Sequence, residues 1–208
     1  DAQIILTPLK NIALGKPVTS SDGDNTSKDH PPSNVVDGSA SHMKGWDCQS
    51  SGSTRPWVQI DLENEYIITR IEYVDRTEFD WIGYRNNFEF QVSNDPDFAT
   101  YKVLGGVGPE GFEDDTTWGL DVSDETPYRY VRFQRTSTEY IYVVEIRVFG
   151  IPAAPVWPEG SELKATNISS TGVTLTWTAA NDGAPVTEYR IYKDSQLLTT
   201  VAGNILSY

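Results

Sequence analysis

The chain has 208 residues and a formal net charge of −14, with 30 acidic against 16 basic residues. A surface this acidic repels the phosphates of nucleic acids and anionic lipid heads, so we expect neither nucleic acid nor a membrane as a partner. A hydrophobic content of 38% is enough for a core, and six tryptophans and eleven tyrosines favour β-strands.

The cysteine content and the apolar runs narrow the setting of the protein. Cys48 is the only cysteine, so no disulfide within the chain holds the fold, and we expect a small buried side chain there. Secreted animal domains of this size commonly carry disulfides, which favours a bacterial origin for a secreted or cell-surface protein. No apolar run approaches the length of a membrane span, about 20 residues.

Short alternating or apolar runs recur along the first part of the chain, and helical periodicity is almost absent. Clusters of Gly, Pro, Asn, Asp and Ser separate these runs, as is usual for turns. Many short strands with long polar loops are typical of a β-sandwich or jelly roll, so the predicted fold class is all-β. The predicted strands are Trp57–Leu62, Ile67–Asp75, Phe88–Ser93, Lys102–Leu104, Tyr128–Arg135 and Tyr142–Phe149.

A proline-rich segment, residues 151–158, divides the chain. Its three prolines predict a stiff, extended linker between a domain over 1–150 and a second over 159–208. Residues 1–150 hold 13 basic and 25 acidic residues, a net charge of −12, whereas residues 151–208 hold 3 and 5, a net charge of −2. Gly172–Trp177 and Tyr189–Lys193 are predicted strands of the second domain.

Ordered sequence blocks run through the first domain. They are Asn11–Val18, Asn34–Gly38, Trp57–Leu62, Phe88–Asp95, Tyr130–Phe133 and Val144–Gly150. In order and spacing these blocks resemble the discoidin superfamily, also called coagulation factor 5/8 type C domains. The resemblance is closest to bacterial carbohydrate-binding module family 32 and to fucose-binding lectins. It implies a discoidin-like jelly-roll β-sandwich that binds sugar.

The second domain resembles the first half of a fibronectin type III domain. The likeness lies chiefly in Leu175–Trp177 and Tyr189–Tyr192. A complete sandwich of that type needs about 90–100 residues, so we expect a truncated domain. The rest would belong to a longer protein or to another chain.

The resemblance implies one structural calcium ion in the first domain. It assigns side-chain ligands to Asp37 and Glu145, and carbonyl ligands to the loop that follows, from Ser39, Ser41 or His42. Calcium takes six to eight oxygen ligands, which this donor set suits. The alternative is that Asp37 caps a turn and Glu145 is a solvated strand residue.

The sugar site is predicted on loops at one end of the sandwich. Sugars bind by stacking an aromatic ring on the apolar face of a pyranose, with charged or amide side chains on its hydroxyls. The loop 76–87 is richest in these types. Its predicted contact residues are Trp81, Tyr84, Arg85 and Asn86. In the alternative, Phe79 or Trp81 folds back onto the core and Arg85 pairs with Asp80.

Two further loops add candidates. His30 lies in the first loop, where related lectins often place a sugar-binding histidine. Phe112 is predicted to be an exposed ring in an acidic tip with Asp114 and Asp115. That tip is either a solvated loop or a site for the ammonium group of an amino sugar.

No catalytic motif is present. The chain lacks zinc-protease, nucleophile-elbow, phosphate-loop and dinucleotide signatures. We therefore predict a non-catalytic module that binds a polysaccharide or glycan, with the catalytic domain elsewhere in a larger secreted polysaccharide-degrading or cell-surface protein. The alternative is an adhesion module that binds a protein or membrane surface. Galactose-type and fucose-type sugars lead the expected ligands, followed by amino sugars and uronic-acid polymers.

Overall fold

The computed structural model divides the chain into unit 1, Asp1–Ile151, and unit 2, Pro152–Tyr208. Nearly all of its regular structure is β, as predicted, and the described residues contain no α-helix. No helix in this part of the chain is long and apolar enough to cross a membrane. The structure describes residues 10–21, 28–41, 43–48, 54–76, 82–113, 117–180 and 186–208.

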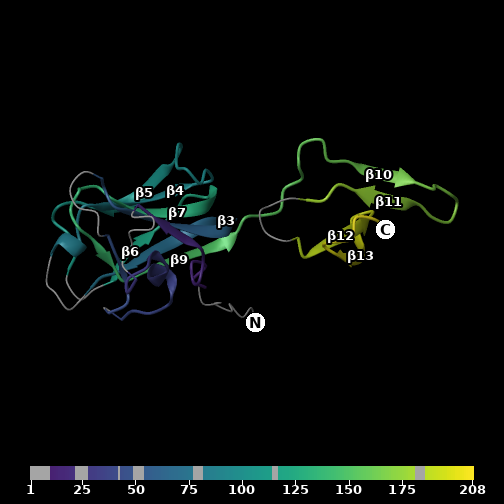
Figure 1. Ribbon diagram of the computed structural model, residues 1–208. Helices are drawn as coiled ribbons and strands as arrows, with labels where there is room; N and C mark the ends of the chain where they lie inside the picture. Colours follow the sequence, from purple (N-terminus) through teal and green to yellow (C-terminus); the bar gives the residue numbers. More distant parts are fainter. Residues whose placement is uncertain are drawn as a thin grey trace, which may run out of the picture. The chain divides into compact units, whose positions relative to one another are not determined.

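Unit 1 is a sandwich of two antiparallel layers (Figure 1). Hydrogen bonds join its main strands into one seven-stranded sheet of order β1-β3-β7-β4-β5, in which β6 and β9 also pair with β3. The strands of unit 1 are β1 (Val18–Ser20), β2 (Trp46–Asp47), β3 (Trp57–Val74), β4 (Phe88–Ser93), β5 (Lys102–Val107), β6 (Thr117–Asp121), β7 (Pro127–Arg135), β8 (Tyr142–Val143) and β9 (Glu145–Pro152). Two short 3-10 helices, η2 (Pro32–Val36) and η3 (Ile82–Tyr84), lie between them, and β2 pairs with β8.

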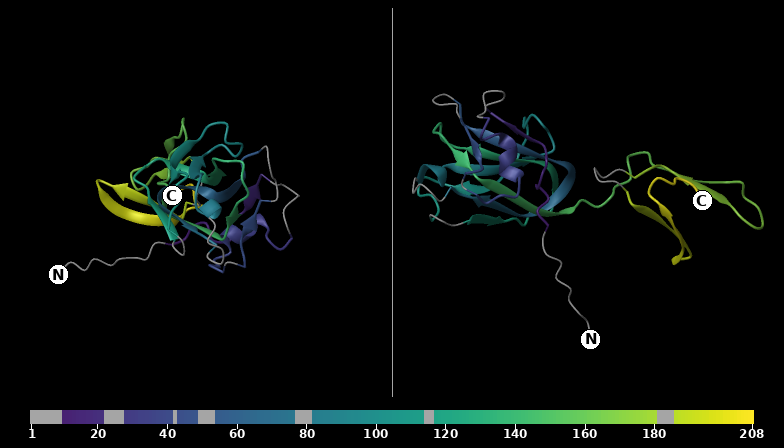
Figure 2. Two further views of the ribbon diagram at one scale, coloured as in Figure 1. Left: turned by 90° about the vertical axis from the view of Figure 1, so that its left-hand side faces the viewer. Right: turned by 60° about the horizontal axis from the view of Figure 1, so that its bottom comes forward.

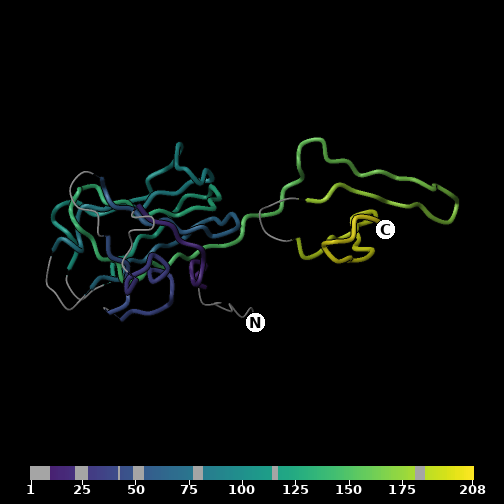
Figure 3. The backbone as a smooth tube through the Cα atoms, viewed as in Figure 1, coloured from purple at the N-terminus to yellow at the C-terminus, as the bar shows by residue number. Residues whose placement is uncertain are grey.

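Strand β3 belongs to both layers. Its first part pairs with β7 from Trp57 to Asp61, the register shifts before Tyr66, and Arg70–Val74 pairs with β6. Glu63 sits at this irregularity with a φ of 66°, which is rare for a residue with a side chain. The bend between the layers can be followed along the backbone trace (Figure 3). The sequence predicts two strands here, and the structure shows one long strand.

The core lies between the two layers, which Figure 2 shows from two further sides. The rings of Phe88 and Phe133, on neighbouring strands of one layer, stack with their centroids 5.1 Å apart. Trp118 of the other layer stacks on Phe90 at 5.8 Å. Such ring pairs add to the hydrophobic free energy of burial. Cys48 is fully buried, as predicted.

The predicted strand Phe88–Ser93 is confirmed, whereas the strand Lys102–Leu104 is longer than predicted. It continues through Gly105 and Gly106 to Val107. The backbone of Gly106 lies so close to β4 that a Cβ atom there would be 2.1 Å from the carbonyl oxygen of Phe88. Glycine therefore permits a close strand contact here instead of a turn. Strand β6 was not predicted, because its Gly119 interrupts the alternating pattern.

Unit 2 consists of two antiparallel hairpins. The first joins β10 (Leu163–Thr166) to β11 (Thr174–Trp177), and the second joins β12 (Glu188–Lys193) to β13 (Gln196–Ala202). The end of the chain pairs with β11, since the N–H and C=O groups of Leu175 and Tyr208 exchange hydrogen bonds of 2.8 and 2.9 Å. Strands β10 and β13 were not predicted. The fibronectin type III assignment of this unit stays a prediction.

Candidate functional site

Several polar and aromatic side chains meet at one end of unit 1, where β3 and β7 end and β4 begins. We call His30, Arg76, Tyr84, Tyr140 and Tyr142 the end cluster. They come from segments far apart in the sequence, and Tyr142 lies at their centre. Its ring is 1% exposed and contacts three of the other four members.

His30 reaches Tyr142 from the first loop. The Nδ1 atom of His30 lies 3.2 Å from the hydroxyl of Tyr142, and the two rings meet edge to face at 5.2 Å. The half-buried imidazole is therefore oriented by Tyr142, which engages Nδ1. The structure brings this predicted residue into the end cluster.

Arg76 lies on the ring of Tyr142. Its guanidinium carbon is 4.4 Å from the ring centroid, a favourable cation–π distance. Strand β3 ends at Val74, and Asp75 accepts a hydrogen bond from the backbone N–H of Arg76. Arg76 therefore lies just beyond the end of β3, where the hydrogen bond to Asp75 holds its backbone.

Tyr84 and Tyr140 complete the cluster. The ring of Tyr84 packs edge to face against Tyr140 at 6.1 Å and against Tyr142 at 6.2 Å. Burial raises the pKa of the Tyr140 phenol, and the carboxylate of Asp47 raises it further. A phenol is protonated at neutral pH, so this hydroxyl can donate a hydrogen bond.

Arg85 is an internal anchor in this structure. Only 4% of the residue is exposed, and its Nε lies 3.2 Å from Oδ2 of the buried Asp75. Its Nη1 also donates to the carbonyl of Phe112 at 2.9 Å. The alternative pairing of Arg85 with Asp80 stays a prediction, because Asp80 lies outside the described residues. A guanidinium can be buried here because a carboxylate and a carbonyl meet it.

Asn86 is also turned inward, at 7% exposure. Its Nδ2 donates to the carbonyl of Pro109 at 3.3 Å, and its backbone carbonyl accepts from Nη1 of Arg135. Arg135 is fully buried and also donates to Glu139 at 3.0 Å. These bonds fix the loop 82–87 against the segment 108–112 and the end of β7.

Phe112 is half-buried instead of exposed. Its ring meets Tyr73 at 5.7 Å and Phe88 at 6.3 Å, so it extends the core. The predicted sugar contacts of Tyr84, Arg85, Asn86 and Phe112 stay predictions, although each of these side chains has internal partners. The predictions for Trp81, His42, Asp114 and Asp115 lie outside the described residues.

The predicted calcium ligands lie together beside η2. Glu145 is fully buried at the start of β9, and its Oε1 accepts the N–H of Gly38 at 3.1 Å. Gly38 has a φ of 82°, a conformation that favours glycine. The Oδ1 atom of Asp37 accepts the N–H of Ser39 at 2.7 Å. The carboxylates of Asp37 and Glu145 therefore lie close to each other and to the backbone of Gly38 and Ser39. We call this place the Asp37–Glu145 point.

The carboxylate and carbonyl oxygens at the Asp37–Glu145 point are of the kind that a hard cation binds. No group of the described residues donates to Oε2 of Glu145, although this atom is buried. Burial, and then the nearby charge of Asp37, raise the pKa of Glu145 to about 8. A divalent cation held by Glu145, Asp37 and the carbonyl of Ser39 would offset both effects. The described residues offer no group of three or more acidic, histidine or cysteine side chains, so backbone carbonyls would have to complete the ligand set.

Arg76, Tyr140 and Tyr142 were not predicted as site residues. Arg76 opens the richest loop, and Tyr140 and Tyr142 alternate just before the last strand of unit 1. Polar and aromatic residues at such positions, just outside a strand, are typical of a site at the strand ends. The sequence does not indicate that these segments and the loop with His30 lie at the same end of the sandwich.

The family model described as the F5/8 type C domain matches residues 17–146. This is more than half of the chain and covers both the end cluster and the Asp37–Glu145 point. No curated protein sequence matches the chain.

Solved structures share the fold of unit 1. A fucose-binding module of Streptococcus pneumoniae is 19% identical with a TM-score of 0.54, over 71% of this chain and 99% of its own. A chitosan-binding module from a Paenibacillus chitosanase/glucanase is 20% identical with a TM-score of 0.52, over 68% and 99%. A Clostridium perfringens module, CpGH89CBM32-4, in complex with GlcNAc-α-1,4-galactose, is 19% identical with a TM-score of 0.53, over 72% and 100%.

Replacing Arg85 by methionine tests its role as an anchor. We expect Arg85→Met to lower the free energy of unfolding by about 3–5 kcal/mol, because Asp75 is left as a buried charge without its guanidinium. Adding Asp75→Asn should restore part of the loss. Urea unfolding of unit 1 measures both changes. Arg70→Met, which breaks surface ion pairs, should cost about 1 kcal/mol or less. Unchanged stability in Arg85→Met would contradict the anchor role.

The raised pKa of Glu145 gives the metal-free protein a dependence on pH. The carboxyl has a pKa of 4.5 before folding and about 8 in the folded chain. Between these values the folded state holds a proton that the unfolded state has lost, so stability falls as pH rises, by at most about 1.4 kcal/mol per pH unit. We expect unfolding in EDTA to show this slope and Glu145→Gln to reduce it. Parallel curves for the two proteins would refute the assignment.

Proposed function

Because the chain belongs to the F5/8 type C domain family, we propose that unit 1 is a non-catalytic carbohydrate-binding module that holds a glycan at its end cluster. The observation that carries the proposal is the placement of Arg76 and His30 on the buried ring of Tyr142, with Tyr140 joined to them through Tyr84. Guanidinium, imidazole and phenol groups beside aromatic carbon are what hydroxyl-rich pyranoses bind.

The members of the cluster have different roles in the proposed site. Tyr142 is buried, so it positions Arg76 and His30 and does not itself stack on a sugar. Arg76 offers N–H donors to a pair of neighbouring hydroxyls, and His30 offers Nε2 as a second polar contact. The half-buried Tyr140 supplies a hydroxyl and an apolar ring edge. Because the donors are already oriented by ring contacts, little side-chain entropy is lost on binding.

The ligand class follows from this chemistry and from the relatives. The similar structures carry fucose-binding, chitosan-binding and GlcNAc-galactose-binding descriptions. A site with one guanidinium and one imidazole suits neutral sugars with neighbouring hydroxyls, so we place galactose-type and fucose-type glycans first. Amino sugars and uronic-acid polymers follow.

We also propose a structural calcium ion, held by Asp37, Glu145 and the backbone carbonyl of Ser39. The support is the buried Oε2 of Glu145, for which no described group provides a donor, beside a second carboxylate. When bound, the ion supplies charge neutralisation and ties η2 and its following turn to β9. It takes no part in sugar chemistry.

The proposed setting is a larger bacterial protein that is secreted or displayed at the cell surface. A weak glycan binder raises the local concentration of a polysaccharide for a catalytic domain elsewhere in the same protein. Unit 1 needs no reaction of its own for this role. The aromatic and cationic groups of the end cluster would hold the polymer while the catalytic domain acts on it.

A glycan array with the full chain tests the function. We expect binding of galactose- or fucose-containing glycans, and a loss of at least about tenfold in affinity for Arg76→Ala, because removing a charged hydrogen-bond donor costs about 1.5–3 kcal/mol. His30→Ala should lose less. Arg70→Ala serves as the control and should bind normally, because Arg70 lies in β3 outside the end cluster, where it pairs with Glu72 and Asp121. Binding that survives both Arg76→Ala and His30→Ala would rule out the end cluster.

Calcium is tested separately by thermal unfolding. We expect added calcium chloride to raise the Tm of unit 1, since a ligand of the folded state alone stabilises it by mass action. Glu145→Gln should abolish most of the rise, whereas Glu125→Gln, at an exposed position, should keep it. An equal rise in both variants would exclude Glu145 as a ligand.

A further inference from the structure

Arg132 in β7 is a half-buried cation that forms no ion pair with a described residue. Burial lowers its pKa, and the opposing effect comes from the phenol of Tyr101 instead of a carboxylate. Other arginines of unit 1 do pair with acidic side chains, namely Arg70, Arg85, Arg129, Arg135 and Arg147. Partly buried charges are usually paired, so a cation left without a counter-ion in a chain of net charge −14 indicates a place for an anionic ligand.

The guanidinium of Arg132 is held in a fixed orientation. Its Nε and Nη2 both donate to Oε1 of Gln59, at 3.2 and 2.6 Å. Nε2 of the same amide donates to the carbonyl of Pro96 at 3.0 Å, which turns the amide oxygen toward Arg132. The guanidinium carbon lies 4.5 Å from the ring centroid of Trp57 and 3.7 Å from that of Phe98, both favourable cation–π distances.

One edge of this guanidinium remains available to a ligand. Gln59 takes the edge formed by Nε and Nη2, so the edge formed by Nη1 and Nη2 is left. Nη1 makes no hydrogen bond with a described residue and is not a buried atom. A carboxylate can accept two parallel hydrogen bonds from such an edge, which is the strong and directional way in which arginine binds anions.

Polar and aromatic side chains surround Arg132 on the side of the sheet that faces away from the core. Their sequence neighbours, among them Val58, Val131 and Phe90, are buried core residues, and alternation therefore turns these side chains outward. The strands β3, β7 and β4 that carry them are neighbours (Figure 1). We call six of them the outer face: Trp57, Gln59, Glu89, Gln91, Arg132 and Gln134.

The strand register brings the members of the outer face side by side. Trp57, Gln134 and Glu89 lie opposite one another in one row, next to the row that contains Arg132. All four of these side chains are half-buried, so each reaches solvent. An indole, an amide and a carboxylate beside a guanidinium are side chains that bind sugar rings and hydroxyls.

We propose that the outer face is a second glycan-binding site, which binds a uronic-acid unit through its carboxylate on the free edge of Arg132. The inference goes beyond the proposed function, because the outer face lies on strands and takes a different sugar from the end cluster. Trp57 offers apolar ring surface to the pyranose. Oε1 of Gln134 accepts no hydrogen bond from a described residue, so it can accept one from a sugar hydroxyl, as can Glu89.

The charges favour a single carboxylate in the ligand. Arg132 neutralises one carboxylate, whereas Glu89 and the net charge of −14 repel further ones. A uronic-acid unit between neutral sugars therefore suits the outer face better than a row of carboxylates, as in an acidic peptide.

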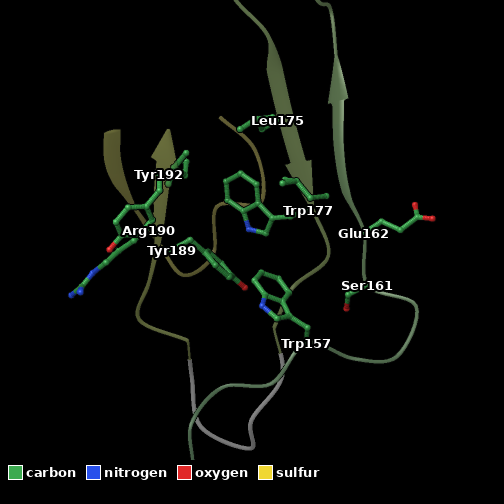
Figure 4. Close-up of a pocket in the computed structure, with 10 residues that line it drawn as sticks. Trp157, Ser161, Glu162, Leu175, Trp177, Tyr189, Arg190 and Tyr192 are labelled. Atoms are coloured by element: carbon green, nitrogen blue, oxygen red, sulfur yellow. The ribbon is translucent and has the colours of Figure 1, made fainter. Parts of the chain in front are cut away.

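The aromatic side chains of unit 2 do not offer the same combination. Trp157, Trp177 and Tyr189 line a hollow of about 470 Å³ (Figure 4). Arg190, which also lines it, is paired with Glu188 at 2.6 Å. A carboxylate would therefore find no unpaired guanidinium among the described residues of this hollow.

The test is an NMR titration of the full chain with methyl glucuronoside and methyl glucoside, which differ by a carboxylate against a hydroxymethyl group. We expect the amides of Gln59 and Arg132 to shift, and the glucuronoside to bind at least about tenfold more tightly, because its carboxylate adds a charged hydrogen bond. Acetate, a carboxylate without the sugar, should bind at least about tenfold more weakly than the glucuronoside. No binding, equal binding of acetate, or shifts confined to Arg76 and Tyr142 would overturn the proposal.

Two arginines of β7 provide matched variants. Arg132→Lys keeps the charge but lacks the planar fork, so it should weaken the glucuronoside at least about tenfold. Arg129→Gln, whose parent residue pairs with Asp61 at 2.7 Å, should bind as the parent chain does. Equal binding by these two variants would overturn the proposal.

Arg76→Ala separates the two sites. It should lose the neutral glycans of the end cluster and keep the glucuronoside, so the outer face and the end cluster can fail independently. Loss of the glucuronoside in Arg76→Ala would place the carboxylate at the end cluster and overturn the proposal.

Discussion

The hydrogen bonds of the buried Arg135 guanidinium are the interactions on which the end of unit 1 that carries the end cluster depends. Arg135 is the last residue of the central strand β7 and is fully buried. Its hydrogen bonds to Asn86 and Glu139 hold the loop before β4 and the loop after β7. Its backbone N–H donates to Pro56, at the start of β3, at 2.8 Å. One residue therefore joins the ends of three strands in the same layer.

The second guanidinium, Arg85, extends this arrangement across the sandwich. Its partner Asp75 directly follows β3 in the other layer. The ion pair therefore joins the loop 82–87 to the end of β3, where Arg76 lies. The two buried arginines hold these loops in place, and in the proposed site the half-buried groups beside them would face the ligand. Preorganised sites need such support, because a loose frame loses affinity through the entropy of ordering.

Sequence reasoning predicted the sandwich, the strand Phe88–Ser93 and the neighbourhood of Asp37 and Glu145. Alternation predicts strands because strand faces are a local pattern, whereas the family resemblance alone implied that Asp37 and Glu145, far apart in the chain, come together. It did not predict that Arg85 is internal. An arginine in a polar loop looks the same whether it meets solvent or a carboxylate, and Asp75 is its partner only through the packing of two layers. Arg76, His30 and Tyr142 meet for the same reason, so their assembly is visible only in three dimensions.

The pairing of the chain's early and late segments within unit 1 has a kinetic consequence. Asn11 forms a bridge with Phe149, and its side chain accepts the N–H of Val148, while β3 holds partners from β1 to β9. Closing such long loops costs entropy before any contact rewards it, so sandwiches of this kind fold on timescales of about milliseconds to seconds. A ribosome makes about 5–20 residues per second, so the sandwich stays open for several seconds until Phe149 has been synthesised. During synthesis, unit 1 is therefore an open chain that chaperones can bind, and its layers close only once the last strand has been made.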